Sequence, residues 1–391
     1  MKRICIVLFA AAVGSAFVRP VSALEPATET VLYSFCSQQD CTDGKTPYAS
    51  LIDVNGTLYG TTANGGASGN GTVFALSPKT GAEKVLYSFP VGNPTSSLID
   101  VNGTLYGATY TGGDYDNGVV FALDPDTGAE TVVHSFGGGA DGSNPYTGLI
   151  EAKGMLYGAT EYGGAHGAGT VFALDPRTGN EQVLYSFCSR VYKCADGSIS
   201  YASPLAVKGT LFGTTEYGGA HKRGTVYALD VDTGAEQALY SFCSEKGCAD
   251  GDTPYAGLIA LKRVLYGTTP YGGRQRFGTV FALDPDTGAE TALYSFCSRR
   301  NCADGTTPEG ALLALDDTLY GTSWAGGTHD DGTVFALDPK TGTEKVLHAF
   351  GSGADGQNPG SALIAAGGAL YGTTFAGGAG GGGTVFALGK P

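Results

Sequence analysis

The feature that most limits how this chain can fold is a short apolar run followed by a turn signature. It reads GTVFALDPDTG at residues 278–288 and returns seven times. The copies begin at Gly71, Gly118, Gly169, Gly224, Gly278, Gly332 and Gly383. One period through nearly all of the 391 residues predicts a single closed repeat array rather than several unrelated domains.

Each repeat contains four short β-type runs and no helical period. In the fifth repeat, these runs are residues 255–261, 264–269, 278–283 and 290–296. The first two runs are joined by a hairpin turn, as at Asn55-Gly56, and the last two by an Asp-Pro-Asp-Thr-Gly turn. The sequence therefore predicts an all-β protein with four antiparallel strands per repeat.

The repeat length and the two ends of the chain predict how the repeats assemble. The leucines of the second run are 47 to 55 residues apart, and four strands per unit near this length are typical of a β-propeller. The chain starts with an isolated fourth run, residues 30–35, and its last repeat lacks that run. We therefore expect a seven-bladed propeller in which the N-terminal strand completes the last blade. An open solenoid is the alternative, but capping repeats are missing.

The first 23 residues resemble a secretory signal peptide. Lys2 and Arg3 precede an apolar run, and Val21-Ser22-Ala23 resembles a cleavage site. We expect residues 24–391 to form the mature propeller domain, secreted or periplasmic, monomeric and without a membrane span. Without the segment, 20 basic and 37 acidic residues remain, a net charge of −17, which disfavours nucleic acid as a partner.

Cysteine spacing agrees with export. Eight cysteines form four local pairs after the fourth run, which predicts four short-range disulfides in an oxidising compartment. Each would close a loop of about six residues and stabilise the fold by roughly 2 kcal/mol. A zinc site is the alternative, but the spacing lacks the CxxC form. The pairs are Cys36/Cys41, Cys188/Cys194, Cys243/Cys248 and Cys297/Cys302.

The repeat unit, LYGTT, then Gly-Gly, then GTVFAL, then TG, then LYSF, resembles that of the secreted GloVer (Gloeo/Verruco) tandem-repeat proteins. The resemblance covers about residues 30–388 and implies an extracellular location without an assigned reaction. Some members carry a C-terminal sorting anchor. The printed sequence ends at Pro391 without such a tail, so free secretion or a periplasmic location is the expectation. The run ALDPDTG also resembles quinoprotein propellers, but those place a tryptophan in nearly every blade and this chain has only Trp324.

Function is expected on the face that carries the fourth-to-first and second-to-third connections, because these loops differ between copies. The second-to-third loops all contain Gly-Gly, and six carry an aromatic residue just before it. These rings either pack blade against blade or form stacking platforms for sugars. The six are Tyr110, Tyr162, Tyr217, Tyr271, Trp324 and Phe375.

Basic residues are concentrated in the loops of blades three to six. Such a cluster attracts anions, and arginine forks onto carboxylate or sulfate groups; the alternative is a solvated rim. The basic loop residues are Arg190, Lys193, Lys222, Arg223, Lys246, Arg274, Arg276, Arg299 and Arg300. The candidate ligand-binding residues are Tyr162, His166, Tyr217, His221, Arg223, Tyr271, Arg274, Arg276, Trp324 and His329.

Two functions follow as hypotheses. The first is a binding or scaffold module for an acidic polysaccharide or an extracellular protein, on the loop face of blades three to six. The second is a polysaccharide-active enzyme, most plausibly a uronate lyase, which needs a cation, a base and an acid. The candidate catalytic residues for the lyase are Tyr217, His221, Arg223 and Arg274. Glu161 and Glu216 are the best pair for a glycosidase.

No cofactor or metal site is expected. Six connections contain Asp-Gly, where the aspartate side chain typically caps a turn. Calcium binding at these positions is the alternative, although no EF-hand spacing is present. The six aspartates are Asp43, Asp141, Asp196, Asp250, Asp304 and Asp355.

Overall fold

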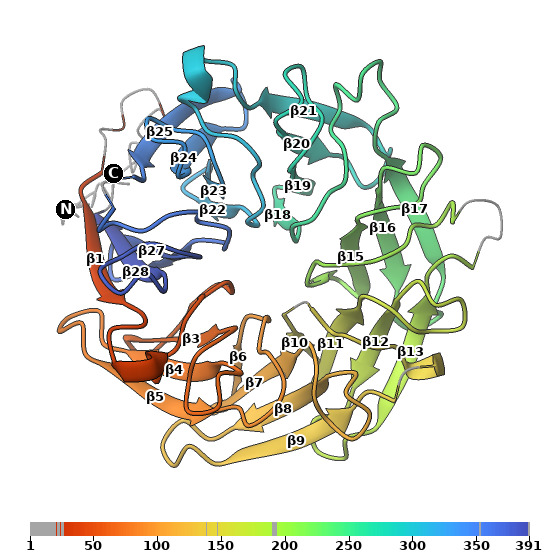
Figure 1. Cartoon of the computed structure of the whole chain (residues 1–391). Helices are drawn as coiled ribbons and strands as arrows, with labels where there is room; N and C mark the ends of the chain where they lie inside the picture. The colour runs from red at the N-terminus through yellow and green to blue at the C-terminus, as the bar shows by residue number, and fades with distance from the viewer. Residues whose placement is uncertain are drawn as a thin grey trace, which may run out of the picture.

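The computed structural model shows a ring of seven four-stranded sheets (Figure 1). It describes Val21, Leu24 and residues 27–389, apart from residues 138, 147, 190–193 and 352. The predicted signal peptide lies outside the described residues except for Val21. No helix within these described residues is long and apolar enough to cross a bilayer.

Blades 1 to 4 follow one another along the chain. Blade 1 contains β2 (Ile52–Val54), β3 (Thr57–Thr62), β4 (Thr72–Leu76) and β5 (Glu83–Ser88). Blade 2 contains β6 (Ile99–Val101), β7 (Thr104–Thr109), β8 (Val119–Leu123) and β9 (Glu130–Ser135). Blade 3 contains β10 (Ile150–Ala152), β11 (Met155–Thr160), β12 (Thr170–Leu174) and β13 (Glu181–Ser186). Blade 4 contains β14 (Leu205–Val207), β15 (Thr210–Thr215), β16 (Thr225–Asp230) and β17 (Glu236–Ser241).

Blades 5 to 7 complete the ring. Blade 5 contains β18 (Ile259–Leu261), β19 (Val264–Thr269), β20 (Thr279–Leu283) and β21 (Glu290–Ser295). Blade 6 contains β22 (Leu313–Leu315), β23 (Thr318–Ser323), β24 (Thr333–Asp338) and β25 (Thr343–Ala349). Blade 7 contains β26 (Ile364–Ala366), β27 (Ala369–Thr374), β28 (Thr384–Gly389) and β1 (Glu29–Ser34). Short 3₁₀ turns are η2 (Gln39–Cys41), η3 (Gly139–Asp141) and η4 (Arg300–Cys302).

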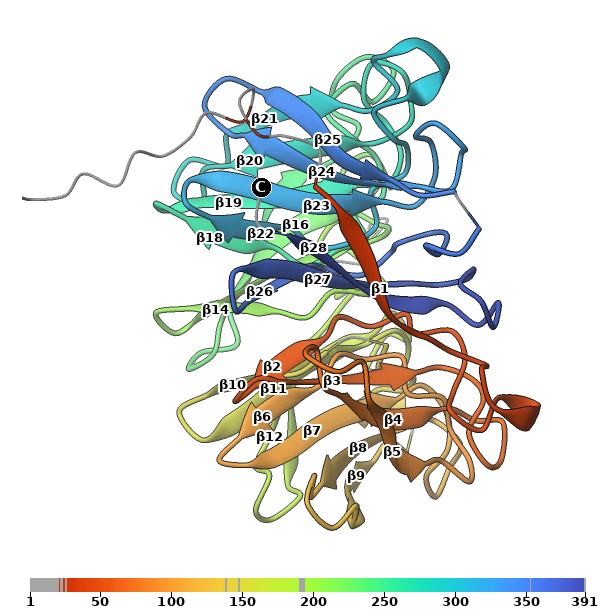
Figure 2. The same ribbon diagram turned by 90° about the vertical axis from the view of Figure 1, so that its left-hand side faces the viewer.

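The first and last strands of the chain close the ring, as the sequence predicts. In blade 7 the strand order is β1-β28-β27-β26, and β1 runs antiparallel to β28. Glu29 lies opposite Leu388, and Ser34 lies opposite Thr384. Figure 2 shows β1 alongside β28 at the outer edge of this blade. Each of the other six blades is a meander of four consecutive antiparallel strands.

The innermost strand of each blade is shorter than the sequence predicts. In blade 5, we expected a strand over residues 255–261, but β18 spans only Ile259–Leu261. The carbonyl oxygen of Ala256 instead accepts a hydrogen bond of 3.1 Å from Thr214 Oγ1 of blade 4. The residues before β18 thus bond across to the neighbouring blade rather than continue the hairpin.

Edge-to-face aromatic pairs join every blade to the next. A phenylalanine just after each outermost strand packs on an aromatic ring of the third strand in the following blade. The ring centroids are 5.0 Å apart for Phe35 and Phe74, and 5.0 Å for Phe242 and Phe281. Such pairs stabilise a core beyond the apolar area that they bury. The other five are Phe89–Phe121, Phe136–Phe172, Phe187–Tyr227, Phe296–Phe335 and Phe350–Phe386.

A repeated glycine gives these rings their space. A Cβ atom added to Gly60 would lie 2.6 Å from the Phe74 ring and 2.9 Å from Leu51. Real Cβ atoms do not approach so closely, so the Gly of each LYG-like sequence is required by packing.

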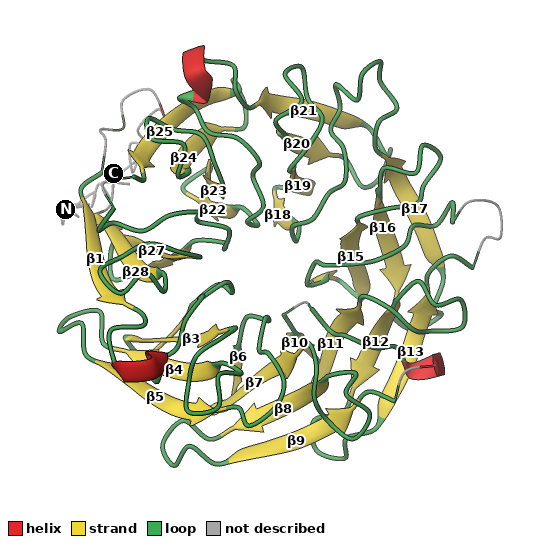
Figure 3. Ribbon diagram, in the orientation of Figure 1, coloured by secondary structure: helices red, strands yellow, loops and turns green. Residues whose placement is uncertain are grey.

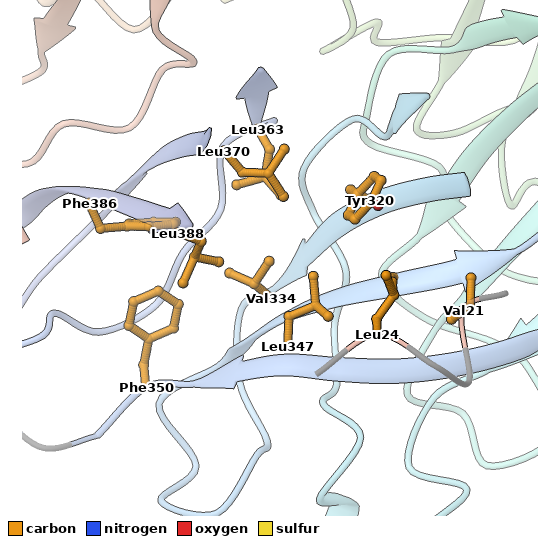
Figure 4. Close-up of a cluster of buried hydrophobic side chains, with 11 residues drawn as sticks. Val21, Leu24, Tyr320, Val334, Leu347, Phe350, Leu363, Leu370, Phe386 and Leu388 are labelled. Atoms are coloured by element: carbon orange, nitrogen blue, oxygen red, sulfur yellow. The ribbon is translucent and has the colours of Figure 1, made fainter. Parts of the chain in front are cut away.

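The junction between blades 6 and 7 includes residues from the start of the chain. Figure 4 shows Leu347 and Phe350 of blade 6 near Phe386 of blade 7, with Val21 and Leu24 in the same buried cluster. The amide of Ala27 donates a hydrogen bond of 3.0 Å to the carbonyl of Leu347. The segment leading into β1 therefore packs along β25 before the chain enters blade 7.

Each outermost strand carries a half-buried glutamate at or next to its start. Burial, aided by the charge of Asp250, raises the pKa of Glu290 to about 8. Burial likewise raises the pKa of Glu83 and Glu181 to about 7, with the charges of Asp43 and Asp141 contributing. The blade junctions therefore hold carboxyl groups that are largely protonated below neutral pH.

We predict that alanine at Phe35 lowers the free energy of unfolding by about 3–5 kcal/mol, the range for a fully buried phenylalanine. Phe242→Ala removes the equivalent ring from blade 4 and serves as the matched control, measured in the same urea titration. Because β1 is a full member of blade 7, the two losses are expected to be similar. A much smaller loss for Phe35→Ala would contradict closure by β1.

We also predict that the thermal unfolding midpoint falls as the pH rises from about 6.5 to 8. A carboxyl whose folded pKa is raised contributes stability at low pH that is lost as it ionises. Burial lowers the pKa of His134 and His348, so these two groups act in the opposite direction, but only below about pH 6.5. Glu290→Gln cannot ionise and is expected to flatten the fall. A midpoint that rises over this interval would refute the prediction.

Candidate functional site

Two sets of variable loops meet on one face of the ring, where Figure 3 draws them in green. They are joined by isolated backbone bridges between Ser143 and Tyr162, Ser198 and Tyr217, and Asp252 and Tyr271. In each bridge, the first residue belongs to the loop that enters a blade and the second to the loop containing Gly-Gly. Loops of neighbouring blades are linked as well, since the amide of Thr253 donates a hydrogen bond of 2.9 Å to the carbonyl of Arg223 in the preceding blade.

The aromatic residues of these loops occupy two different positions rather than one ring. Tyr162, Tyr217 and Tyr271 directly precede Gly-Gly and are exposed, at 42%, 44% and 54%. Trp324 stands one residue earlier in its repeat and packs against Tyr48, with ring centroids 6.4 Å apart. Tyr110 and Phe375 share that earlier position. Successive side chains in extended backbone point to opposite sides, so the shift of one residue turns Trp324 and Phe375 toward Tyr48, although Phe375 stays 38% exposed.

The three exposed tyrosines, Tyr162, Tyr217 and Tyr271, form what we call the tyrosine arc over blades 3 to 5. A hydrogen bond to Glu161 is the main cause that raises the pKa of Tyr162 to about 12. A hydrogen bond to Glu216 likewise raises the pKa of Tyr217, which also interacts electrostatically with Tyr271. Electrostatic interactions link Tyr162 to Tyr217 and Tyr217 to Tyr271, so the three phenol groups follow one another along this face.

Two predicted arginines lie beside the arc. Arg223 Nη1 is 3.4 Å from Asp252 Oδ2, and the charges of Arg223 and Arg276 oppose the rise in the pKa of Asp252 that burial causes. The backbone of Asp252 bridges to Tyr271, and the charge of Arg223 also acts on Tyr217. The structure therefore brings these predicted residues together: Tyr162, Tyr217, Tyr271, Arg223 and Arg276.

The other predicted residues lie elsewhere. Arg274 lines a groove of about 580 Å³ beside β21, the outermost strand of blade 5. His329 Nδ1 lies 3.0 Å from Thr328 Oγ1, and its ring is close to Gly351. His166 and His221 are exposed on their loops. Arg190 and Lys193 lie outside the described residues.

The predicted disulfides are present, which removes the zinc alternative for these cysteines. The bonds join Cys36 to Cys41, Cys188 to Cys194, Cys243 to Cys248, and Cys297 to Cys302. All four lie in loops that enter a blade, on the face that carries the tyrosine arc. Each disulfide restricts the unfolded chain, so the four bonds are expected to stabilise the folded loops of this face.

The Asp-Gly aspartates hold loops in place. Asp250 Oδ2 accepts hydrogen bonds of 2.8 Å from both the amide of Ser244 and Tyr240 Oη. Asp43 and Asp304 are fully buried and accept the same kinds of hydrogen bond. Among the described residues, no group of three or more His, Cys, Asp or Glu side chains could hold a metal ion. The carboxylates of Asp43, Asp250 and Asp304 already accept hydrogen bonds from hydroxyl and amide groups of the protein.

The sequence analysis missed a second set of residues at the central channel. They occupy the same position in each of the seven repeats, just before the innermost strand. In six of the seven repeats, the residue at this position follows a proline. Tyrosine occurs at this position in four of the seven repeats, between nearly constant neighbours. This recurrence is the sequence signal that could have predicted the cluster. The residues are Tyr48, Thr95, Tyr146, Tyr201, Tyr255, Glu309 and Gly360.

These channel residues line a pocket of about 280 Å³. The rings of Tyr48 and Tyr146 are 6.0 Å apart and edge-to-face, and those of Tyr146 and Tyr201 are 5.2 Å apart. Tyr201 stacks on Tyr255 at 4.6 Å. An aromatic cluster therefore spans the channel near its loop-face mouth.

Three glutamates accompany this cluster. Glu161 is only 4% exposed and accepts a hydrogen bond of 2.7 Å from Tyr201 Oη. Burial raises the pKa of Glu309 to about 7, and burial also raises the pKa of Glu216. Carboxyl and phenol groups, rather than the predicted basic residues, thus dominate the channel mouth.

Solved structures with a similar fold include proteins of different activities. An oligogalacturonate lyase in complex with manganese has a TM-score of 0.58 at 12% identity, covering 94% of each chain. Another oligogalacturonate lyase, from Vibrio parahaemolyticus, has a TM-score of 0.57 at 11% identity, covering 93% of this chain and 94% of that one. A puromycin-hydrolyzing peptidase from Mycobacterium tuberculosis has a TM-score of 0.53 at 13% identity, covering 90% of this chain and 52% of that one. These identities establish the propeller fold alone.

The sequence itself places the chain more narrowly. No curated protein matches it. The Gloeobacter/Verrucomicrobia repeat matches residues 20–194 and 189–386, nearly the whole propeller. The chain therefore belongs to the Gloeobacter/Verrucomicrobia repeat family.

Proposed function

We propose that the protein is an extracytoplasmic binding module that holds an acidic polysaccharide along the tyrosine arc of blades 3 to 5. The observation that carries this proposal is the equivalent, exposed position of Tyr162, Tyr217 and Tyr271 on three consecutive blades, with Arg223 and Arg276 beside them. The four disulfides support an oxidising compartment outside the cytoplasm.

The chemistry of the arc suits an extended acidic sugar chain. Tyrosine combines a flat apolar ring with a polar tip at low entropic cost, so three in a row provide stacking surfaces for successive sugar rings. The arginines supply planar donors for uronate or sulfate groups. Arg223 is 53% exposed in its side chain and its ion pair with Asp252 is only partly buried, so a ligand carboxylate can compete for it.

We predict that polygalacturonate or alginate binds in calorimetric titrations whereas neutral dextran does not. Tyr217→Ala and Arg223→Ala are each expected to weaken binding about tenfold, the effect of losing one stacking or charged contact. Tyr115→Ala is the matched control, because Tyr115 is 65% exposed on the corresponding loop of blade 2 and outside the arc. Arg263→Ala, in a turn between the first two strands of blade 5, controls for net charge.

Several results would refute this proposal. Equal binding of dextran would show that the arginines do not select charge. An unchanged affinity for Tyr217→Ala would remove the arc from the site. Capture of an extracellular protein without any polysaccharide binding would favour the protein-partner alternative on the same face.

A uronate lyase is the second candidate, since two oligogalacturonate lyases share the fold. Such a reaction removes the C5 proton, breaks the C4–O bond and forms a C4=C5 double bond. Three features weigh against the candidate residues: Tyr217 has a raised pKa, Arg223 is paired with Asp252, and Arg274 lines a separate groove. The ultraviolet absorbance of unsaturated uronate is therefore expected to stay constant during the binding assay. Product formation abolished by His221→Ala would instead establish the lyase.

A further inference from the structure

The central channel contains a cavity that the polysaccharide proposal does not use. Its volume of about 280 Å³ is slightly below the usual range for pockets that hold drug-sized ligands, so it suits a small molecule. The inner walls are small residues such as Ser97, Gly257 and Ala311, which leave the space open. None of the candidate ligand residues from the sequence analysis lines it.

The mouth-side wall of this cavity is aromatic. Tyr48, Tyr146, Tyr201 and Tyr255 all line it, and they contact one another in sequence around the channel. Their ring faces carry partial negative charge, which attracts a cation placed within about 6 Å. The four tyrosines come from four different blades and form one wall of this space, packed edge-to-face or stacked on one another.

The cavity also carries negative charge without a basic counterpart. Glu309 lines it, and its charge acts on Tyr48, Tyr146 and Tyr255. Neither lysine nor arginine occurs among the described lining residues. Thr95 Oγ1, also at the wall, is buried without a hydrogen-bond partner among the described groups. A carboxyl in an aromatic cavity is a poor site for an anion and a good one for an organic cation.

We propose that this channel pocket binds a small alkylammonium cation, with the ammonium group against the wall formed by Tyr48, Tyr146, Tyr201 and Tyr255 and with Glu309 neutralising it. A quaternary or methylated ammonium fits this chemistry best, because its surface is apolar while its charge is positive. The proposal concerns the channel, not the tyrosine arc, and does not depend on polysaccharide binding.

The ionisation of Glu309 provides a second way to test cation binding in the channel pocket. Burial holds the pKa of Glu309 at about 7 in the free protein. The titratable groups around it are Tyr48, Tyr146 and Tyr255, and the charges of Glu161 and Glu216 also act on Tyr255. All three tyrosines have raised pKa values because of burial, so they stay neutral near pH 7. A bound cation favours the ionised carboxylate, so affinity for the cation rises as the pH increases through neutrality.

The test uses choline and its uncharged analogue 3,3-dimethylbutan-1-ol, which has the same shape without the charge. In calorimetric titrations of the full protein, we expect choline to bind and the neutral analogue to bind at least about tenfold more weakly. Choline affinity is expected to increase between about pH 6 and pH 8. Equal affinity for the two compounds, or no choline binding at millimolar concentration, would overturn the proposal.

Single-residue variants test whether choline binds in the channel pocket. Glu309→Gln keeps the shape of the side chain and is expected to weaken choline binding about tenfold and to remove its pH dependence. Tyr48→Leu is expected to weaken binding by a similar factor. Tyr115→Ala, on an exposed loop of blade 2 and outside both the arc and the pocket, is the control and leaves choline binding unchanged. Unchanged choline affinity in Glu309→Gln would refute the assignment, and circular dichroism spectra establish that each variant is folded.

Discussion

The edge-to-face contact between aromatic rings of adjacent blades is the interaction on which the rest of the structure depends. It recurs at all seven junctions, including Phe350–Phe386 and Phe35–Phe74 on either side of the closing blade. The rings are fully buried, and a glycine such as Gly60 must face them because a methyl group would collide. Since each blade makes the same contact with the next, the sheets adopt one repeated angle and the ring closes. Closure in turn determines which loops become neighbours.

Ring closure gives the loop face two regions of different chemistry. The tyrosine arc with Arg223 and Arg276 lies on the exposed surface of blades 3 to 5. The channel mouth gathers tyrosines with Glu161 and Glu309 in a more buried environment. The two regions come from different loops: the arc lies in the loops that contain Gly-Gly, and the channel tyrosines lie in the loops that enter each blade. Ring closure therefore places stacking surfaces for a sugar chain outside and an aromatic cavity with a carboxyl group inside.

The acidic composition also has distinct local consequences. Aspartates such as Asp250 accept hydrogen bonds from neighbouring loop residues, so their charge stabilises the loops that the disulfides constrain. Glutamates such as Glu290 sit in the blade junctions, where one carboxylate oxygen has no hydrogen-bond partner among the described residues and burial raises the pKa. Although burial opposes them, hydrogen bonds lower the pKa of Asp196, whereas burial raises the pKa of Glu290.

The number of blades, their closure by residues 30–35 and the pairing of the cysteines could all be predicted from the amino-acid sequence. These properties depend on short patterns repeated along the chain, and such patterns can be recognised without knowing which distant residues are in contact. The meeting of Tyr48, Tyr146, Tyr201, Tyr255 and Glu309 around one cavity became visible only in the folded structure. These residues are some fifty or more positions apart and become neighbours because the innermost strands converge on the ring axis. The different directions of the Tyr217 and Trp324 side chains could likewise be assigned only from the backbone, because side chains one residue apart face opposite sides.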